Sequence, residues 1–240
     1  MRLLGKYAVL TGGNKGIGLA VARAFVAEGC GVLITGRDRE ALQSAEAELQ
    51  GARLAGAEVI AEVCDVRDEQ AVAAVFAKVK ERWGRLDILV NNAGVSQETL
   101  TIADTPVELW RSVVDTNLTG MFLCTRAALP LMPRGSAIVN TLSLTVKGAV
   151  PKFGAYNASK AGALGLTQTL REELIPKGIR VTALMPGATD TAIWEQFWPT
   201  APREKMVRAE DVAAGVLYAV TLPPEANLSE LLLVPLKGML

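Results

Sequence analysis

Short apolar runs alternate with longer helical stretches along almost the whole chain. Seven runs rich in Val, Ile and Leu lack strict apolar and polar alternation, which is typical of strands covered on both faces. They span residues 7–11, 31–35, 58–63, 86–91, 137–141, 180–185 and 230–234. Segments with helical spacing of Ala, Leu, Glu, Lys and Arg lie between them, at residues 17–28, 39–55, 69–83, 107–131, 155–176 and 209–221. This order predicts βαβ units and an α/β fold with a three-layer, doubly wound parallel sheet of Rossmann type.

Length and charge limit the classes of protein that this chain can belong to. Its 240 residues are 50% hydrophobic, so we expect residues 1–240 to form a single domain around one large core. The 25 basic and 25 acidic residues are well mixed and give no net charge, which argues against nucleic acid or an anionic membrane as partner. No apolar run reaches the ~18 residues that a membrane span needs.

The chain contains no histidine, which removes imidazole bases, Ser-His triads and metal sites built on His. We therefore expect no metal. Cys30, Cys64 and Cys124 are widely spaced and form no CxxC pair, so they are predicted to be buried thiols in a reducing compartment, most simply the cytoplasm. The first apolar run is interrupted after Thr11 and is too short for a signal segment.

The first predicted strand ends in a glycine-rich turn, TGGNKGIG, at residues 11–18. Gly12, Gly16 and Gly18 permit a tight turn, a close approach of pyrophosphate and close packing of the helix on the sheet. The helix that starts at Ile17 would present free N–H groups to the anion. Glycine turns without a nucleotide are common, but the position between a strand and a helix favours nucleotide binding.

The end of the second predicted strand indicates which dinucleotide binds. A carboxylate there would hold the ribose 2′-hydroxyl of NAD, but the sequence reads Thr35-Gly36-Arg37. Arg37 can hold a 2′-phosphate bidentately, and Lys15 in the glycine turn adds a second cation, so NADP is favoured over NAD. The alternative is that both are ordinary surface charges, and Asp38 next to Arg37 counts against a phosphate.

Polar residues also follow the third and fourth predicted strands, at the sheet edge where ligands bind. Asp65 is a candidate partner for an adenine amino group; the alternative, a cap of the next helix, fits Asp68 better. Asn91, Asn92, Ala93 and Gly94 follow the fourth strand and either admit a close backbone approach or form a simple turn. Asn117 lies in an apolar helical stretch, where its amide needs a partner, as a structural group or as part of a network.

Two hydroxyl residues and an aromatic cluster follow the sixth predicted strand. Pro186 and Gly187 end that strand, and the hydroxyls of Thr189 and Thr191 can reach an amide or a phosphate. Trp194, Phe197 and Trp198 are spaced as one face of a short helix. They either pack against the body of the protein or cover an apolar substrate as a lid.

The stretch at residues 143–160, SLTVKGAVPKFGAYNASK, carries the strongest catalytic signal. Tyr156 and Lys160 are four residues apart and share one face of the predicted helix. An adjacent cation favours the phenolate and lowers the pKa of a phenol from ~10. Tyr156 can then exchange a proton with a carbonyl oxygen to which Ser143 offers a hydroxyl. By itself the pair is more often an exposed aromatic beside a solvated amine.

Together, these residues resemble the short-chain dehydrogenase/reductase family, in its compact single-domain branch that includes 3-oxoacyl carrier-protein reductases and carbonyl reductases. TGGNKGIG, NNAG, Asn117, Ser143, YNASK and PGATDT occur in the order and spacing of that family, from about Lys6 to Val234. The resemblance implies a seven-stranded parallel sheet in a single domain and an NADP-dependent reaction between a carbonyl compound and the corresponding alcohol.

The resemblance also implies a role for each matching residue. Tyr156 protonates the carbonyl oxygen, Ser143 orients it, Lys160 lowers the Tyr pKa and binds the nicotinamide ribose, and Asn117 helps to hold a water that relays protons. The cofactor-binding residues that it implies, with the two catalytic residues that also touch the cofactor, are Gly12, Asn14, Lys15, Gly16, Ile17, Gly18, Arg37, Asp65, Val66, Asn92, Ala93, Gly94, Tyr156, Lys160, Pro186, Gly187, Thr189 and Thr191. A homo-oligomer, a dimer or tetramer packed through the helices at 107–131 and 155–176, is also implied.

Two segments depart from the family pattern. The ending ELLLVPLKGML lacks the usual Gly-Gly pair, and the segment at 192–206 is short and carries the aromatic cluster.

Two other functions are less consistent with these residues. A nucleotide-sensing module that has kept the cofactor fold without catalysis is disfavoured by the complete tetrad. An epimerase or dehydratase of the extended relatives is disfavoured because a longer C-terminal substrate domain is missing.

Overall fold

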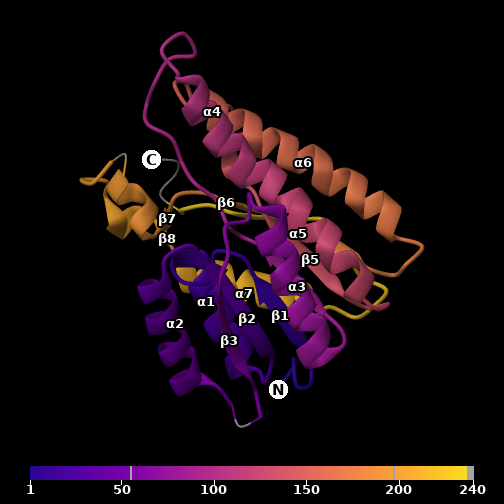
Figure 1. The fold of residues 1–240 in the computed structure, drawn as a ribbon. Coiled ribbons are helices and arrows are strands. Elements are labelled where there is room, and N and C mark those ends of the chain that lie inside the picture. The colour runs from indigo at the N-terminus through magenta and orange to yellow at the C-terminus, as the bar shows by residue number, and fades with distance from the viewer. Residues whose placement is uncertain (55, 197, 237–240) are drawn as a thin grey trace.

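The computed structural model describes residues 1–54, 56–196 and 198–236 (Figure 1). Seven parallel strands form one sheet in the order β3-β2-β1-β4-β5-β6-β9. Their bounds are β1 Tyr7–Leu10, β2 Gly31–Gly36, β3 Val59–Val63, β4 Ile88–Asn91, β5 Ala137–Thr141, β6 Arg180–Pro186 and β9 Glu230–Leu233. Strand β1 pairs through Ala8 with Val32 of β2 on one side and Ile88 of β4 on the other. The predicted doubly wound, seven-stranded sheet is confirmed.

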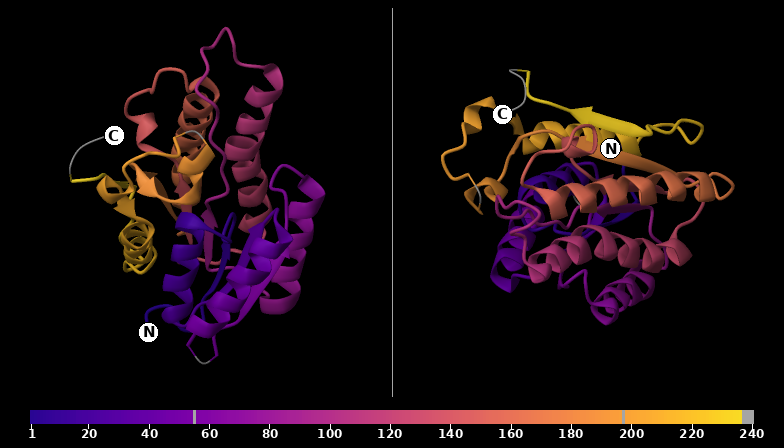
Figure 2. Two further views of the ribbon diagram at one scale, coloured as in Figure 1. Left: turned by 90° about the vertical axis from the view of Figure 1, so that its left-hand side faces the viewer. Right: turned by 90° about the horizontal axis from the view of Figure 1, so that it is seen from above.

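Helices cover both faces of the sheet, which gives the three layers seen in Figures 1 and 2. One face carries α1 (Gly16–Ala27), α2 (Arg39–Ala52) and α7 (Ala209–Val220), whose apolar residues share one core cluster. The other face carries α3 (Glu69–Trp83), α4 (Val107–Val114), α5 (Gly120–Ala128) and α6 (Gly154–Leu174). A second cluster joins α3, α5 and α6 to the strands. None of the helices in the described ranges is long and apolar enough to cross a membrane.

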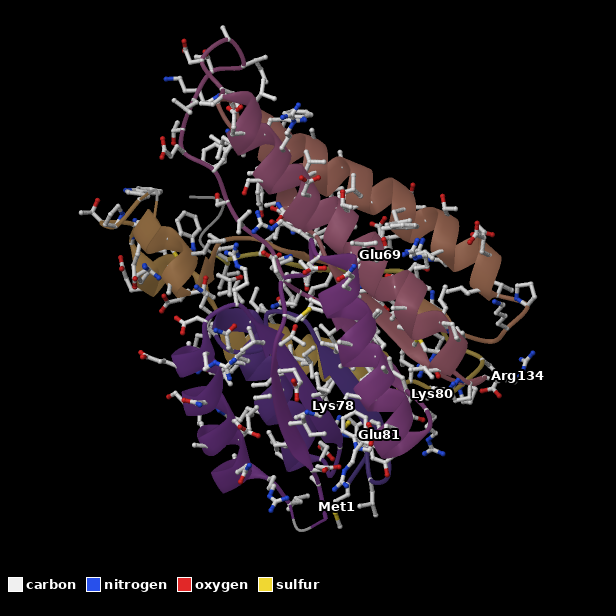
Figure 3. All side chains as sticks on the ribbon, in the orientation of Figure 1. Met1, Glu69, Lys78, Lys80, Glu81 and Arg134 are labelled. Carbon is white, nitrogen blue, oxygen red and sulfur yellow. The ribbon has the colours of Figure 1, made fainter. Side chains whose placement is uncertain are left out.

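The division of α3 into two faces shows why the helices pack as layers. Its inward residues are buried at helical spacing and belong to the second cluster: Val72, Val75, Phe76 and Val79. The charged residues labelled along α3 in Figure 3 are exposed: Glu69, Lys78, Lys80 and Glu81. The helix begins at Asp68, whose carboxylate accepts hydrogen bonds from the N–H groups of Gln70 and Ala71. The prediction that Asp68 caps this helix is therefore confirmed.

The helical stretch predicted at 107–131 contains a local change of winding. Between α4 and α5, the segment Asp115–Thr119 forms a π-helical turn, and a 3-10 turn, Leu129–Leu131, follows α5. π turns inside α-helices are often found at functional sites. Asn117 lies within this turn.

The segment at 188–207 is a small subdomain above β6. Its two ends pair as short parallel strands, β7 Thr189–Asp190 and β8 Val207–Arg208. Between them lie two 3-10 turns, Ala192–Gln196 and Arg203–Lys205. The Arg203 guanidinium donates to the Asp190 carboxylate at 2.8 Å and to the Thr191 carbonyl at 2.6 Å, so the two halves of this segment are tied together.

Candidate active site

A cleft of about 880 Å³ runs along the carboxyl edge of the sheet. The loops after β1, β2 and β3 line one part of it, which we call the β1–β3 half. The loops after β4, β5, β6 and β9 line the other part, the β4–β9 half. The boundary between β1 and β4 is where the chain direction across the sheet reverses, and such a switch point is the usual ligand site of doubly wound sheets.

Most of the predicted site residues line this cleft. They are Gly12, Asn14, Lys15, Gly16, Ile17, Arg37, Asp65, Val66, Asn92, Ala93, Gly94, Ser143, Tyr156, Lys160, Pro186, Gly187, Thr189 and Thr191. The two others, Gly18 and Asn117, lie behind the lining. A Cβ at Gly18 would approach the Gly12 carbonyl oxygen to 2.2 Å, so this glycine permits the close packing of α1.

The glycine turn is shaped so that side chains are excluded from it. Gly12 and Gly16 have φ values of +62° and +54°, which L-residues rarely adopt. A Cβ at Gly12 would lie 3.0 Å from Ala93 Cα, and one at Gly16 would lie 3.1 Å from Thr191 Cγ2. The turn therefore contacts both the loop after β4 and the segment after β6 through bare backbone.

Thr11 and Asn92 hold the two central loops of the cleft together. The Thr11 hydroxyl accepts hydrogen bonds from the N–H groups of Asn92 and Ala93 at 2.9 and 3.0 Å. In return, the Asn92 side-chain amide donates to the carbonyls of Thr11 and Gly12 at 3.2 and 3.0 Å. The amide of Asn92 thus has a structural partner, and the turn is rigid before any ligand binds.

The end of β2 presents basic rather than acidic groups to the cleft. Arg37 and Lys15 both line it. Asp38 also lines it, but its carboxylate accepts a hydrogen bond from the Ala41 N–H at 3.1 Å and so caps α2. A Cβ at Gly36 would lie 2.7 Å from Asn14 Oδ1, which explains why a glycine precedes Arg37.

The carboxylate of Asp65 has a partner within its own loop. It accepts from the Arg67 backbone N–H at 3.0 Å and forms a bidentate pair with the Arg67 guanidinium. These bonds hold the pKa of Asp65 below its ordinary value. The sequence predicted Asp65 at this edge of the sheet but did not predict its pairing with Arg67.

Tyr156, Lys160 and Ser143 meet in the β4–β9 half. The Lys160 ammonium lies 5.7 Å from the centre of the Tyr156 ring, as their spacing on α6 predicted. Lys160 Nζ also donates to the Thr141 carbonyl at the end of β5 at 2.9 Å. Ser143, two residues further along, also lines the cleft, and its hydroxyl lies near enough to the Tyr156 phenol to influence its pKa. A Cβ at Gly94 would lie 3.3 Å from the side-chain oxygen of Asn117, so this glycine leaves room for that buried amide.

The predicted direction of the Tyr156 pKa is wrong for this structure. Burial raises the pKa of Tyr156, and the nearby Ser143 hydroxyl lowers it by less. Burial also lowers the pKa of Lys160 to about 8. Removal from water disfavours both the phenolate of Tyr156 and the ammonium of Lys160. This effect exceeds the electrostatic attraction between phenolate and ammonium that the i,i+4 spacing predicted. At neutral pH the phenol is therefore protonated, and Lys160 carries its charge only below about pH 8.

Lys160 should reduce the stability of the protein, and its replacement by Met should increase it. Because the pKa is near 10.5 in the unfolded chain and about 8 in the folded one, the folded state disfavours the bound proton. We expect Lys160→Met to raise the free energy of unfolding at pH 7 by about 2 kcal/mol, after allowing for the lost hydrogen bond to Thr141. The native protein should itself become more stable as the pH rises from about 8 to about 10.5, where only the unfolded chain binds the proton.

Denaturant unfolding at pH 7 and pH 9.5 measures this effect. The difference between the native protein and Lys160→Met should be smaller at pH 9.5. Lys177→Met, which changes an exposed lysine beyond the end of α6, is the matched control and should alter stability little. A Lys160→Met protein less stable than the native one at pH 7 would contradict the assignment of Lys160 as a destabilising buried cation.

Asn117 lies behind the catalytic groups and is almost fully buried. Its side-chain oxygen accepts from the Val95 N–H at 2.8 Å, and its NH₂ group donates to the Val95 carbonyl and the Ser159 hydroxyl, both at 3.0 Å. The amide therefore joins the π turn to the loop after β4 and to α6. The Asn117 amide is therefore satisfied, and through the Ser159 hydroxyl, which donates to the Tyr156 carbonyl, it also belongs to a hydrogen-bond network.

Gln97 is a further residue of this region, and sequence reasoning missed it. Its buried side chain accepts from the Tyr156 N–H at 2.8 Å and donates to the carbonyls of Glu98 and Lys152, each at 3.2 Å. It therefore fixes the first turn of α6, which carries Tyr156, against the loop after β4. Lys152 has a φ of +67°, which is unusual for a residue with a side chain, so the chain makes a sharp turn into α6. No local pattern marked Gln97, since two of its partners, Lys152 and Tyr156, are 55 and 59 residues away.

The aromatic cluster covers the β4–β9 half. Trp194 and Trp198 both line the cleft, and their rings contact each other edge to face at 6.1 Å. The Trp194 indole N–H donates to the Thr189 carbonyl at 2.8 Å, which ties the aromatic segment to β7. Their place in the lining favours the lid over simple packing against the body. Phe197, the third predicted member, lies outside the described residues.

The comparisons with known proteins agree with this geometry. The profile of the short chain dehydrogenase family matches residues 6–202. An uncharacterised oxidoreductase of Staphylococcus saprophyticus is 33% identical over 98% of this chain and 99% of its own.

Two solved structures with high similarity carry a cofactor. A short chain dehydrogenase from Burkholderia cenocepacia in complex with NADP is 32% identical, with a TM-score of 0.88, over 97% of this chain and 98% of its own. A metagenomic short-chain oxidoreductase, also in complex with NADP, is 32% identical, with a TM-score of 0.85, over 98% of this chain and 99% of its own.

This chain belongs to the short-chain dehydrogenase/reductase family. It is therefore an oxidoreductase of a family that uses a nicotinamide cofactor and acts on small molecules. The predicted family is confirmed.

Proposed function

We propose that the protein is an NADP-dependent carbonyl reductase or alcohol dehydrogenase, which interconverts a ketone or aldehyde and the corresponding alcohol. The observation that carries this proposal is the meeting of the Tyr156 phenol, the Ser143 hydroxyl and the Lys160 ammonium in one cleft. A carbonyl oxygen under reduction needs hydrogen-bond donors and then a proton. This group of side chains can supply both.

The β1–β3 half fits a dinucleotide. Its glycine turn excludes side chains at Gly12 and Gly16, and the N-cap residue Lys15 makes no side-chain capping bond to α1, which favours an anion at the helix start. When bound, the nicotinamide supplies hydride to the carbonyl carbon or accepts it from the alcohol. The cofactor-binding residues would be those predicted from the sequence, with Gly18 supporting the turn from behind.

Two cationic side chains favour NADP over NAD. Arg37 and Lys15 line the cleft, and a guanidinium is well suited to bidentate recognition of a phosphate. The Asp38 carboxylate caps α2 by accepting from the Ala41 N–H, so one of its oxygens is engaged by that helix rather than by a ribose hydroxyl. The NADP complexes of the two similar structures support the same choice.

The proposed roles of the catalytic groups follow from their charges. The Tyr156 phenol is protonated at neutral pH, since burial raises its pKa above the ordinary value, and it acts as the acid that gives its proton to the carbonyl oxygen. Ser143, which lines the cleft beside the phenol, donates to the same oxygen. Lys160, protonated below about pH 8, stabilises the phenolate that the transfer leaves behind. Asn117 completes the proposed tetrad by fixing Val95, and the family resemblance adds a role in proton relay towards Lys160.

Assembly and location are also proposed on particular observations. Trp110 on α4 and Phe122 on α5 are 40% and 44% exposed, and large exposed apolar side chains favour an interface. We expect a homo-oligomer, a dimer or tetramer, packed through α4, α5 and α6.

All three cysteines are free and buried, which suits a reducing compartment such as the cytoplasm.

A screen of NADPH consumption tests this function against the alternative of a catalytically silent module. Ketones and aldehydes of several classes are added to the protein with NADPH, and the loss of absorbance at the nicotinamide band is followed. At least one class should give turnover that depends on both protein and carbonyl compound. NADPH binding without turnover on any class would favour the silent module.

A further inference from the structure

The two halves of the cleft differ in charge. The β1–β3 half is lined by four charged residues: Lys15, Arg37, Asp38 and Asp65. In the β4–β9 half, the described lining residues include one charged side chain, Lys160, which lies beside Tyr156. Beyond that catalytic group, the described wall offers no counter-charge to a charged ligand.

The wall of the β4–β9 half is largely apolar, and its residues come from three separate loops. Val95 follows β4, Val150 and Phe153 precede α6, and Ile193, Trp194 and Trp198 belong to the segment after β6. Val150 and Trp198 are 42% and 40% exposed, so the cleft carries apolar surface that a ligand could bury. Burial of such surface is the main favourable contribution when an apolar molecule binds.

The described lining of this half includes four aromatic side chains, Phe153, Tyr156, Trp194 and Trp198, and contacts between their rings orient them. The Phe153 ring meets the Tyr156 ring edge to face at 6.4 Å, directly beside the catalytic phenol. Trp194 meets Trp198 in a similar way, and its indole N–H is already bonded to Thr189. Ordered aromatic faces favour flat or cyclic ligands, which stack on them with little loss of conformational freedom.

We infer that the substrates are uncharged, largely apolar ketones that carry a ring, and that keto acids and phosphorylated carbonyl compounds are poor substrates. The inference rests on the proposed function and identifies its substrate class. Apart from Lys160, whose charge the proposed mechanism uses beside Tyr156, no described residue of the β4–β9 wall offers a cationic partner to a carboxylate or phosphate that has lost its water.

A matched pair of substrates tests the inference. Methyl 4-acetylbenzoate and 4-acetylbenzoate carry the same aryl ketone, and they differ in a neutral ester against a carboxylate. The value of kcat/KM with NADPH should be about 100-fold higher for the ester, because an unpaired charge in apolar surroundings costs several kcal/mol. Equal values for the two compounds, or a higher value for the acid, would overturn the inference.

A second experiment changes the charge of the wall of the β4–β9 half. Val150→Lys places a cation in an exposed part of the lining and should narrow the ratio of ester to acid by at least about 10-fold. Ile175→Lys, at a more exposed apolar position beyond the end of α6 and outside the cleft lining, is the control and should leave the ratio unchanged. A ratio that does not respond to Val150→Lys would mean that the substrate does not contact this wall.

Binding measurements keep this inference separate from the proposed function. Calorimetry on protein saturated with NADP⁺ should show tighter binding of the ester than of the acid, whether or not either is turned over. If no carbonyl compound consumes NADPH but this order of binding holds, the proposed function fails and the assignment of the apolar site stands. A second neutral ring ketone, 1-tetralone, is measured alongside the ester. If keto acids or phosphorylated sugars are reduced while the ester and 1-tetralone are neither bound nor reduced, the substrate class is wrong and the oxidoreductase function stands.

Discussion

Replacement of Tyr156 by Phe is expected to lower kcat for carbonyl reduction about 1,000-fold, because the change removes the only atom of that side chain that can give a proton. The ring would keep its edge-to-face contact with Phe153, and the backbone N–H would keep its bond to Gln97, so the fold should be unaffected. The Kd for NADPH, measured by fluorescence titration, should change by less than about 3-fold.

A matched variant distinguishes the loss of an acid from a general effect of removing a phenolic hydroxyl. Tyr218→Phe makes the same substitution on α7, where the side chain is 58% exposed and does not line the cleft. It should leave kcat unchanged. If Tyr156→Phe kept more than about a tenth of the native kcat, another group would have to supply the proton, and the assignment of the acid would be wrong.

Replacement of Arg37 by Asp is expected to reverse the cofactor preference. The change removes a guanidinium suited to a bidentate bond with the 2′-phosphate and places a carboxylate where it repels that phosphate. Hydrogen bonds to charged groups contribute about 1.5–3 kcal/mol each, so the Kd for NADPH should rise at least about 100-fold. NADH binding should stay the same or improve, because a carboxylate there can accept from the ribose 2′-hydroxyl.

Steady-state kinetics with both cofactors measures this change. The ratio of kcat/KM for NADPH over NADH should fall by about 1,000-fold in Arg37→Asp. Arg111→Asp, which makes the same change of charge on the exposed surface of α4 outside the cleft, should alter the ratio little. An unchanged preference in Arg37→Asp would mean that the phosphate site lies elsewhere.

The parts of the fold that the sequence predicted are those with a local pattern. The strand at residues 7–11, for example, lies within two residues of the observed β1, because a buried parallel strand is a continuous apolar run bounded by glycines. The glycine turn could be predicted because Gly12 and Gly16 adopt positive φ values. Such values favour glycine and therefore leave a visible pattern in the sequence. The i,i+4 spacing correctly predicted that Lys160 would lie beside Tyr156.

The features that sequence reasoning missed depend on contacts between distant segments. The π turn between α4 and α5 contains Asn117, whose side chain bonds to Val95 and Ser159, and no periodicity in residues 107–131 marks it. Gln97 contacts the start of α6 across the cleft wall. The direction in which the Tyr156 pKa shifts from its ordinary value depends on how far the folded chain excludes water from the phenol. The spacing of Tyr156 and Lys160 on a helix contains no information on that exclusion.

The most direct test of the central claim follows an isotope from the cofactor to the product. The protein is supplied with NADPH deuterated on one face at C4, in parallel reactions for the two faces, and with a ketone from the screen. The alcohol is then analysed by mass spectrometry. If hydride passes from NADPH to the carbonyl carbon, we expect one deuterium on the carbinol carbon from one of the two labelled cofactors. If Tyr156 is the acid, the amount of labelled product should fall about 1,000-fold in Tyr156→Phe. Alcohol formed without deuterium from either labelled cofactor, or labelled product formed equally well by Tyr156→Phe, would contradict the central claim.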